Sequence, residues 1–181
     1  MDKRKLSELL VEHKEKAIGD HAFTPREILA QAADMARQKE IHVITGVRRS
    51  GKSTLMRLIA RYLIREENVP RENILYLNFE DDRFAEFKTP DFQTLYESYL
   101  EVESPSGRKY FFLDEIQNLP GWHRWLNRLY EFEDVKLFIT GSNSSMMKGE
   151  AAMSLTGRNR LITLYPFSFR EYAAACDVTW T

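Results

Sequence analysis

The chain has 181 residues, and its 26 lysines and arginines against 27 aspartates and glutamates give a formal net charge of −1 at pH 7. This length predicts one domain, or one domain with a small extension, and the charge excludes a whole-chain electrostatic case for binding nucleic acid or an anionic membrane. No apolar run approaches the ~20 residues that span a bilayer, and no secretory signal is expected. With Cys176 as the only cysteine, no intrachain disulfide can form, and we expect a cytoplasmic protein.

Two helices are predicted at the start of the chain. Apolar residues at helical spacing indicate the first over residues 3–16. Thr24 as N-cap, Pro25 at the first helical position and Glu27 closing a capping box predict a second helix that runs to about Gln38.

Short apolar runs then alternate with helical stretches. The predicted strands are Ile41–Thr45, Asn73–Phe79, Tyr110–Leu113, Val135–Thr140 and Leu161–Leu164, and the predicted helices are Lys52–Glu66, Asp91–Val102, Gly121–Phe132 and one that starts near Ser168. The third run is apolar throughout and the fourth nearly so, as in central strands covered on both faces. This alternation predicts an α/β fold with a mainly parallel sheet.

Residues 46–53, GVRRSGKS, match the phosphate-binding pattern G-x-x-x-x-G-K-[ST]. Glycines let the chain curl so that backbone N–H groups face phosphate oxygens, and we expect Lys52 to reach the β- and γ-phosphates and Ser53 to hold Mg²⁺. A strand directly before the loop and a helix directly after it favour this reading over a plain glycine turn. The residues expected to contact the nucleotide are Gly46, Val47, Arg48, Arg49, Ser50, Gly51, Lys52, Ser53 and Thr54.

Two acids, Asp114 and Glu115, directly follow the third apolar run. We expect Asp114 to hold the metal, directly or through water, and Glu115 to act as the base that polarises the attacking water. Such a pair can also be a solvated strand end, but the phosphate loop upstream disfavours that interpretation. The adjacent glutamate also favours nucleotide hydrolysis over transfer to a small-molecule acceptor.

Polar residues follow the fourth run and precede the fifth. Ser142 and Asn143, with Thr140 ranked after them, are expected to hold the water between the metal-binding acid and the γ-phosphate; a plain polar turn is an equally open reading. Arg158 can reach the γ-phosphate of a neighbouring subunit as an arginine finger. From sequence alone, a surface arginine or a structural ion pair is the slightly favoured interpretation of Arg158.

Together these residues resemble the prokaryotic predicted ATPases of the AAA+ superfamily, whose AAA module is followed by a C-terminal domain of unknown function. The matching stretches, from about Ile41 to Tyr172, are ITGVRRSGKSTLMRL, ILYLNFEDDRF, KYFFLDEIQNLPGW, KLFITGSNSSMM and LTGRNRLITLYPFSFREY. The resemblance implies a P-loop NTPase of the ASCE type, with a five-stranded sheet of order 5-1-4-3-2 flanked by helices, and MgATP as the ligand.

The resemblance also carries residue roles. It implies Walker roles for Lys52, Ser53, Asp114 and Glu115, the sensor-1 position for Ser142 and Asn143, and a finger role for Arg158, with Arg160 as the less secure choice. We expect residues 1–38 to form an N-terminal helical extension and residues 39–181 the AAA+ core. Because such proteins continue into a helical lid and further domains, the lid and the C-terminal domain are expected to be missing from this chain.

The first functional hypothesis is therefore a core that binds ATP and Mg²⁺ and hydrolyses ATP, weakly in this chain, with a homo-oligomer through Arg158 considered for the full-length protein. The second is an ATP-dependent binding or switch module with negligible turnover, acting on a protein or DNA partner. A small-molecule kinase is disfavoured, and this chain indicates neither a nucleic-acid nor a membrane partner. The adenine pocket is expected near Phe23–Arg26. Asp82 and Arg83 are considered for contact with a substrate or a neighbour, with a solvated acidic loop as the favoured interpretation.

Overall fold

The computed structural model describes residues 1–141, 153 and 155–176 of the chain. Their strands form one sheet in the order β2-β3-β4-β1-β5, and every neighbouring pair is parallel. The strands are β1 (Ile41–Thr45), β2 (Ile74–Asn78), β3 (Lys109–Asp114), β4 (Val135–Thr140) and β5 (Asn159–Thr163). Counted from the other edge, this order is 5-1-4-3-2, so the predicted topology and the α/β fold are confirmed.

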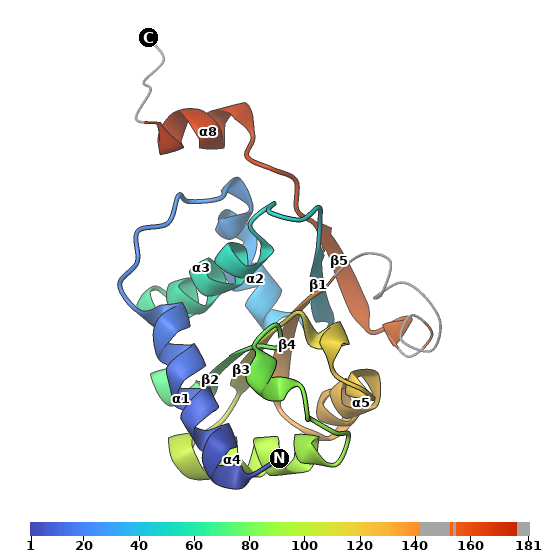
Figure 1. The fold of residues 1–181 in the computed structure, drawn as a ribbon. Helices are drawn as coiled ribbons and strands as arrows, with labels where there is room; N and C mark the ends of the chain where they lie inside the picture. The colour runs from blue at the N-terminus through green and yellow to red at the C-terminus, as the bar shows by residue number, and fades with distance from the viewer. Residues whose placement is uncertain (142–152, 154, 177–181) are drawn as a thin grey trace.

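Helices cover both faces of the sheet (Figure 1). They are α1 (Lys3–Ile18), α2 (Ala32–Arg37), α3 (Lys52–Arg65), α4 (Asp91–Glu103), α5 (Trp122–Phe132) and α8 (Phe169–Ala175), with 3-10 turns η1 (Glu27–Gln31), η2 (Arg71–Asn73), η3 (Asp82–Phe84) and η4 (Ile116–Asn118). None of the helices in the described part of the chain combines the length and the apolar character that a membrane span requires.

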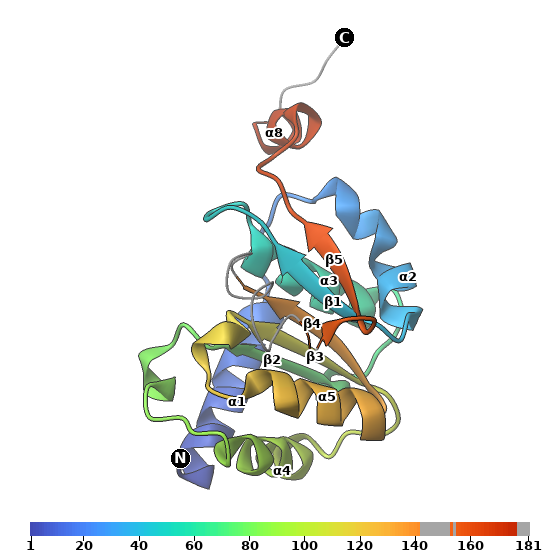
Figure 2. The same cartoon turned by 90° about the vertical axis from the view of Figure 1, so that its right-hand side faces the viewer.

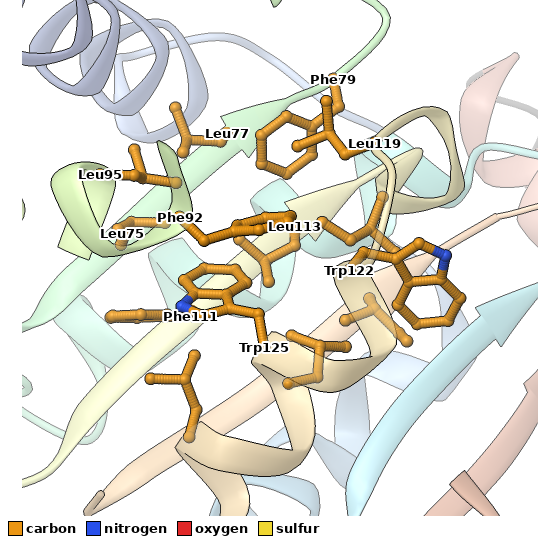
Figure 3. Packing of buried hydrophobic residues seen from close by; sticks show 14 of the residues in the cluster. Leu75, Leu77, Phe79, Phe92, Leu95, Phe111, Leu113, Leu119, Trp122 and Trp125 are labelled. Carbon is orange, nitrogen blue, oxygen red and sulfur yellow. The ribbon is translucent and has the colours of Figure 1, made fainter. Parts of the chain in front are cut away.

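Two apolar clusters, one on each face of the sheet, form the core. Successive residues of a strand point to opposite faces, so Phe111 packs in the cluster with α4 and α5, whereas Phe112 packs in the cluster with α2 and α3. In the first cluster the rings of Phe92 and Trp125 stack with their centroids 4.6 Å apart (Figure 3). Trp122 and Trp125 are both buried there, so core packing explains these tryptophans.

Helix α1 lies along β2, which is an edge strand of the sheet. Its leucines Leu6 and Leu9 belong to the first cluster, and Ala17 and Ile18 belong to the second, so α1 bridges the two faces. An uncovered edge strand exposes unpaired backbone groups. Here α1 covers that edge.

The helix expected from Thr24 to Gln38 is the main difference between prediction and structure. Residues Glu27–Gln31 form the 3-10 turn η1, whose N-cap, Arg26, makes no side-chain cap bond, and the α-helical part is only α2. The predicted capping box is therefore wrong. Its physical reason is that the Glu27 N–H, which Thr24 was expected to satisfy, donates instead to Glu171 Oε1 at 2.8 Å.

Candidate functional site

The segment between β1 and α3, residues 46–51, is termed the glycine loop here, and its shape requires glycine at residue 46. Gly46 has φ +154°, and a Cβ there would lie 2.2 Å from the carbonyl oxygen of Leu164. Gly51, at φ 93°, is the N-cap of α3. The first N–H groups of a helix have no partner within it, so the start of α3 presents donors and the positive end of its dipole to an anion. Lys52 Nζ lies at the same place and donates to the Gly46 carbonyl at 3.4 Å.

Asp114, the last residue of β3, is fully buried at the end of the sheet from which this loop leaves. Its Oδ1 accepts a hydrogen bond from the Thr140 hydroxyl of β4 at 2.5 Å, and its Oδ2 accepts one from the Tyr76 hydroxyl of β2 at 3.1 Å. Burial, followed by the charge of Asp114, raises the pKa of Tyr76, which keeps its hydroxyl protonated as a donor. Hydroxyls from both neighbouring strands therefore fix the carboxylate of Asp114.

Glu115 follows Asp114 in the left-handed backbone region, with φ 54°. Its N–H donates to Thr140 Oγ1 at 2.9 Å, and its Oε2 accepts a hydrogen bond from Gln117 Nε2 at 2.5 Å. Non-glycine residues adopt this conformation rarely, and such strain recurs at functional sites. Thr140 thus contacts both acids at the end of β3.

The strand register brings this set of residues together. Leu113 pairs with Ile139, and Ile44 pairs with Thr140, so Asp114 lies next to Thr140, which lies next to the end of β1. The glycine loop begins directly after β1. The carboxyl ends of the strands therefore carry four of the residues predicted from the sequence, Lys52, Ser53, Asp114 and Glu115. Ser142 and Asn143 are outside the described residues.

Arg158 lies at the opposite end of the strands, directly before the start of β5. Its carbonyl accepts a hydrogen bond from the N–H of Ile41, the first residue of β1, and its guanidinium is ion-paired with Glu131 of α5 at 2.8 Å. Arg160, the alternative, is 3.7 Å from Glu40. The glycine loop follows the opposite end of β1, so a contact between Arg158 and the nucleotide of a second copy stays a prediction.

A cavity of about 510 Å³ opens beside the glycine loop and is termed the loop cavity here. It is lined by Arg26, Arg49, Ser50, Gly51, Thr54, Pro166, Phe167 and Tyr172. Of the segment expected to form the adenine pocket, Arg26 borders this cavity. Phe23, whose ring lies under the guanidinium of Arg61, lines a separate cavity of about 320 Å³.

The segment after β2 is tied to α1. The Nε2 of His13 lies 3.0 Å from Asp81 Oδ2, and its Nδ1 accepts the N–H of Asn78 at 3.2 Å. Burial lowers the pKa of His13, so the neutral ring with its proton on Nε2 satisfies both contacts. Arg83, which was considered for contact with a substrate or neighbour, is ion-paired with Asp81 and Glu12.

Two residues that hold other groups near the site, Tyr76 and Glu171, were not predicted from the sequence. Tyr76 sits in an apolar run, where a buried phenol needs a hydrogen-bond partner, and that need is the only signal in the sequence. Glu171 lies at the third helical position after Ser168, and the two residues form a complete capping box. That pattern predicts the start of α8 and gives no sign of the contact between Glu171 and Arg26.

Known proteins resemble this chain over most of its length. A family model described as an AAA domain matches residues 38–173. An uncharacterized protein of Haemophilus influenzae is 42% identical over 141 residues, covering 76% of this chain and 34% of that relative. An uncharacterized protein of Methanocaldococcus jannaschii, MJ1544, is 33% identical over 134 residues, covering 74% of this chain and 28% of that relative. The chain therefore spans about a third of the length of these relatives or less.

Two solved structures share the fold at low sequence identity. PCH-2 of C. elegans superposes with a TM-score of 0.53 and 16% identity, covering 78% of this chain and 42% of that chain. RIF2 of Saccharomyces cerevisiae superposes with a TM-score of 0.53 and 9% identity, covering 95% of this chain and 67% of that chain. The parallel sheet, the glycine loop and the family match lead to one conclusion: the chain belongs to the AAA domain family and is a nucleotide-binding, ATPase-like core.

Proposed function

We propose that this core binds ATP together with Mg²⁺ and hydrolyses the γ-phosphate bond. The observation that carries the proposal is the carboxylate of Asp114, fully buried at a strand end beside the glycine loop. Within the described residues no cationic side chain is ion-paired with it, and the two side chains that donate to it are neutral hydroxyls. A buried carboxylate is costly without a cation, and carboxylate and hydroxyl oxygens are ligands that Mg²⁺ prefers.

In this proposal, separate residues bind the metal, bind the phosphates and accept the proton of the attacking water. Ser53 and Asp114 hold the metal, which supplies neutralisation of charge on the phosphates when bound. Lys52 and the backbone N–H groups of the glycine loop bind the phosphates. Glu115 accepts the proton of the attacking water, and the bond from its N–H to Thr140 fixes its backbone.

The loop cavity supports an adenosine nucleotide as the ligand. It adjoins the glycine loop and has aromatic walls from Phe167 and Tyr172, which suit the face of a purine base. Its volume of about 510 Å³ is within the range of small-molecule sites.

Two variants test the proposal, with Mg²⁺-dependent ATP binding measured by calorimetry and phosphate release measured on the same samples. Lys52→Ala is expected to lose ATP binding, because it removes the cation that meets the phosphates. Glu115→Gln is expected to keep binding and to lose phosphate release by about 10²-fold or more, because the amide cannot take a proton. Glu86→Gln, at an exposed acid after β2, is the matched control and should behave as the wild type. Full phosphate release by Glu115→Gln contradicts its role as base.

The alternative is a switch module that binds ATP with negligible turnover. The position of Arg158 supports this alternative. An arginine that is paired with Glu131 at the amino-terminal ends of the strands cannot complete this chain's own site. ATP binding by the wild type without phosphate release, in a sample that binds one nucleotide per chain, supports the switch module. Release that Glu115→Gln abolishes supports hydrolysis.

A further inference from the structure

Arg26 and Glu171 form a buried ion pair between two segments that are far apart in sequence. Arg26 Nε lies 2.9 Å from Glu171 Oε1, and the two side chains are 4% and 7% exposed. Arg26 precedes η1, and Glu171 belongs to α8. Buried charges persist only when paired and hydrogen-bonded, so this contact fixes the position of both segments.

The guanidinium of Arg26 also binds the glycine loop. Its Nη1 donates to the Ser50 carbonyl at 2.8 Å, and its Nη2 donates to the Tyr165 carbonyl, just after β5, at 2.8 Å. The guanidinium carbon lies 5.0 Å from the centre of the Phe167 ring. One side chain therefore joins the glycine loop, the segment after β5 and α8.

Both oxygens of the Glu171 carboxylate accept hydrogen bonds in this arrangement. Besides Arg26, its Oε1 accepts the N–H of Glu27 at 2.8 Å, and its Oε2 accepts the N–H of Ser168 at 2.9 Å. Burial alone raises the pKa of this carboxyl, but the bonds from Arg26 and from the two backbone groups outweigh it and lower the pKa overall. Glu171 is therefore held as a charged partner at the first turn of α8.

Besides this contact, α8 is tied to Glu27 by two exposed contacts, from the hydroxyl of its N-cap Ser168 at 3.3 Å and from Arg170 at 3.5 Å. Figures 1 and 2 both show it standing off beyond the end of β5. Glu171 and Ala173 are its buried residues, whereas Phe169 and Tyr172 are exposed. The buried ion pair between Arg26 and Glu171 therefore links α8 to the glycine loop.

We propose that Arg26 and Glu171 are positioning residues that couple nucleotide binding in the loop cavity to the position of α8. This inference rests on the proposed ATP binding. A nucleotide in the loop cavity meets Arg26 and Tyr172 of α8 as parts of its wall, while the Ser50 carbonyl that Arg26 holds belongs to the phosphate-binding loop. Occupancy therefore stabilises the position of α8, and displacement of α8 weakens nucleotide binding by the same factor.

The test compares Glu171→Gln with Arg170→Gln. The control removes an exposed ion pair between the same two segments, in which Arg170 lies 3.5 Å from Glu27. Two quantities are measured: the Kd for MgATP, and amide hydrogen exchange in residues 169–175 with and without MgATP. In the wild type and in Arg170→Gln, MgATP is expected to slow exchange in α8; in Glu171→Gln that slowing disappears and the Kd rises about tenfold, a typical coupling between sites.

A second variant covers the case in which Glu171→Gln leaves Arg26 uncompensated and unfolds the chain. Arg26→Met with Glu171→Met removes both charges together, which proteins often tolerate. In the folded double variant, α8 exchange is expected to be indifferent to MgATP. Slowing of α8 exchange by MgATP in either folded variant, as in the wild type, overturns the coupling alone. Failure of the wild type to bind MgATP overturns both the coupling and the proposed function.

Discussion

At the scale of single residues, the carboxylate of Asp114 is fixed by the hydroxyls of Thr140 and Tyr76, which come from the two strands that flank β3. Asp114 and Glu115 were predicted because two acids follow an apolar run, and both lie at the end of β3 beside the glycine loop. Thr140 was considered only for a water, and Tyr76 was not considered at all. Their bonds to Asp114 depend on which strands become neighbours and in what register, and local sequence does not specify either.

Tyr76→Phe is predicted to weaken Mg²⁺ binding at the site while leaving the fold intact. The substitution removes the hydroxyl that fixes Asp114 Oδ2 and changes no buried volume of consequence. Loss of such an outer partner typically costs about 10- to 100-fold in metal affinity. Calorimetric titration of Mg²⁺ in the presence of ATP measures it.

Tyr99→Phe is the matched control for that variant, because this buried tyrosine donates to the Glu72 carbonyl on the α4 side, away from the glycine loop. It should lose a comparable hydrogen bond and keep the wild-type Mg²⁺ affinity. Equal Mg²⁺ affinities for Tyr76→Phe, Tyr99→Phe and the wild type remove Tyr76 from the site.

At the scale of elements, the parallel sheet was predictable because its strands are short apolar runs separated by amphipathic helices. β1 and β4 begin and end where they were predicted, and the order follows the predicted topology. The predicted start of the helix at Thr24 was wrong because the N–H of Glu27 donates to Glu171, an acceptor remote in sequence, and not to Thr24. Capping patterns predict well only where the local donor has no better long-range acceptor.

β4 also carries a fully buried lysine that no pattern singled out. Lys136 Nζ donates to the carbonyls of Gln38 and Glu40 and lies 2.7 Å from His42 Nδ1, so it joins β4 to the connection between α2 and β1. Burial, then the charge of Arg108, lowers the pKa of Lys136 to about 7. The charge of Glu40 raises the pKa of Lys136 and the charge of Arg160 lowers it, and both effects are smaller than that of Arg108.

Lys136→Met is predicted to flatten the pH dependence of stability between pH 7 and pH 10. In the unfolded chain this lysine keeps its proton up to its ordinary pKa of 10.5, whereas in the folded chain it releases the proton from about 7. The unfolded state therefore binds more protons in this window, and the free energy of unfolding of the wild type rises with pH across it. Urea unfolding at four pH values between 7 and 10 measures the slope.

Lys109→Met, on the adjacent strand β3, serves as the control for Lys136→Met. Lys109 lies 4.0 Å from Glu133 and is half-buried, so its loss removes a lysine without removing the buried contacts of Lys136. Its slope should equal that of the wild type. A wild-type slope in Lys136→Met shows that Lys136 does not contribute to the pH dependence.

At the scale of the whole molecule, the two ends of the parallel strands carry different functional residues. The glycine loop, Asp114 and the loop cavity lie where the strands end, whereas Arg158 lies where β5 begins, beside Glu131 of α5. The near-neutral charge of −1 permits close approach of two copies without strong mutual repulsion. An Arg158 that serves a second copy is consistent with both observations.

If Arg158 acts in trans, phosphate release per chain should rise with protein concentration, because only associated copies bring the arginine to a nucleotide. A finger is worth about 10³–10⁵ in rate where it operates, so even a small associated fraction dominates turnover. Arg158→Ala should remove the concentration dependence and leave ATP affinity in dilute solution unchanged. Arg160→Ala tests the alternative arginine, and Arg128→Ala, on the exposed side of α5, controls for loss of surface charge. Robust turnover per chain that is independent of concentration, at dilutions where light scattering shows only monomer, excludes the trans role and leaves Arg158 as the structural partner of Glu131.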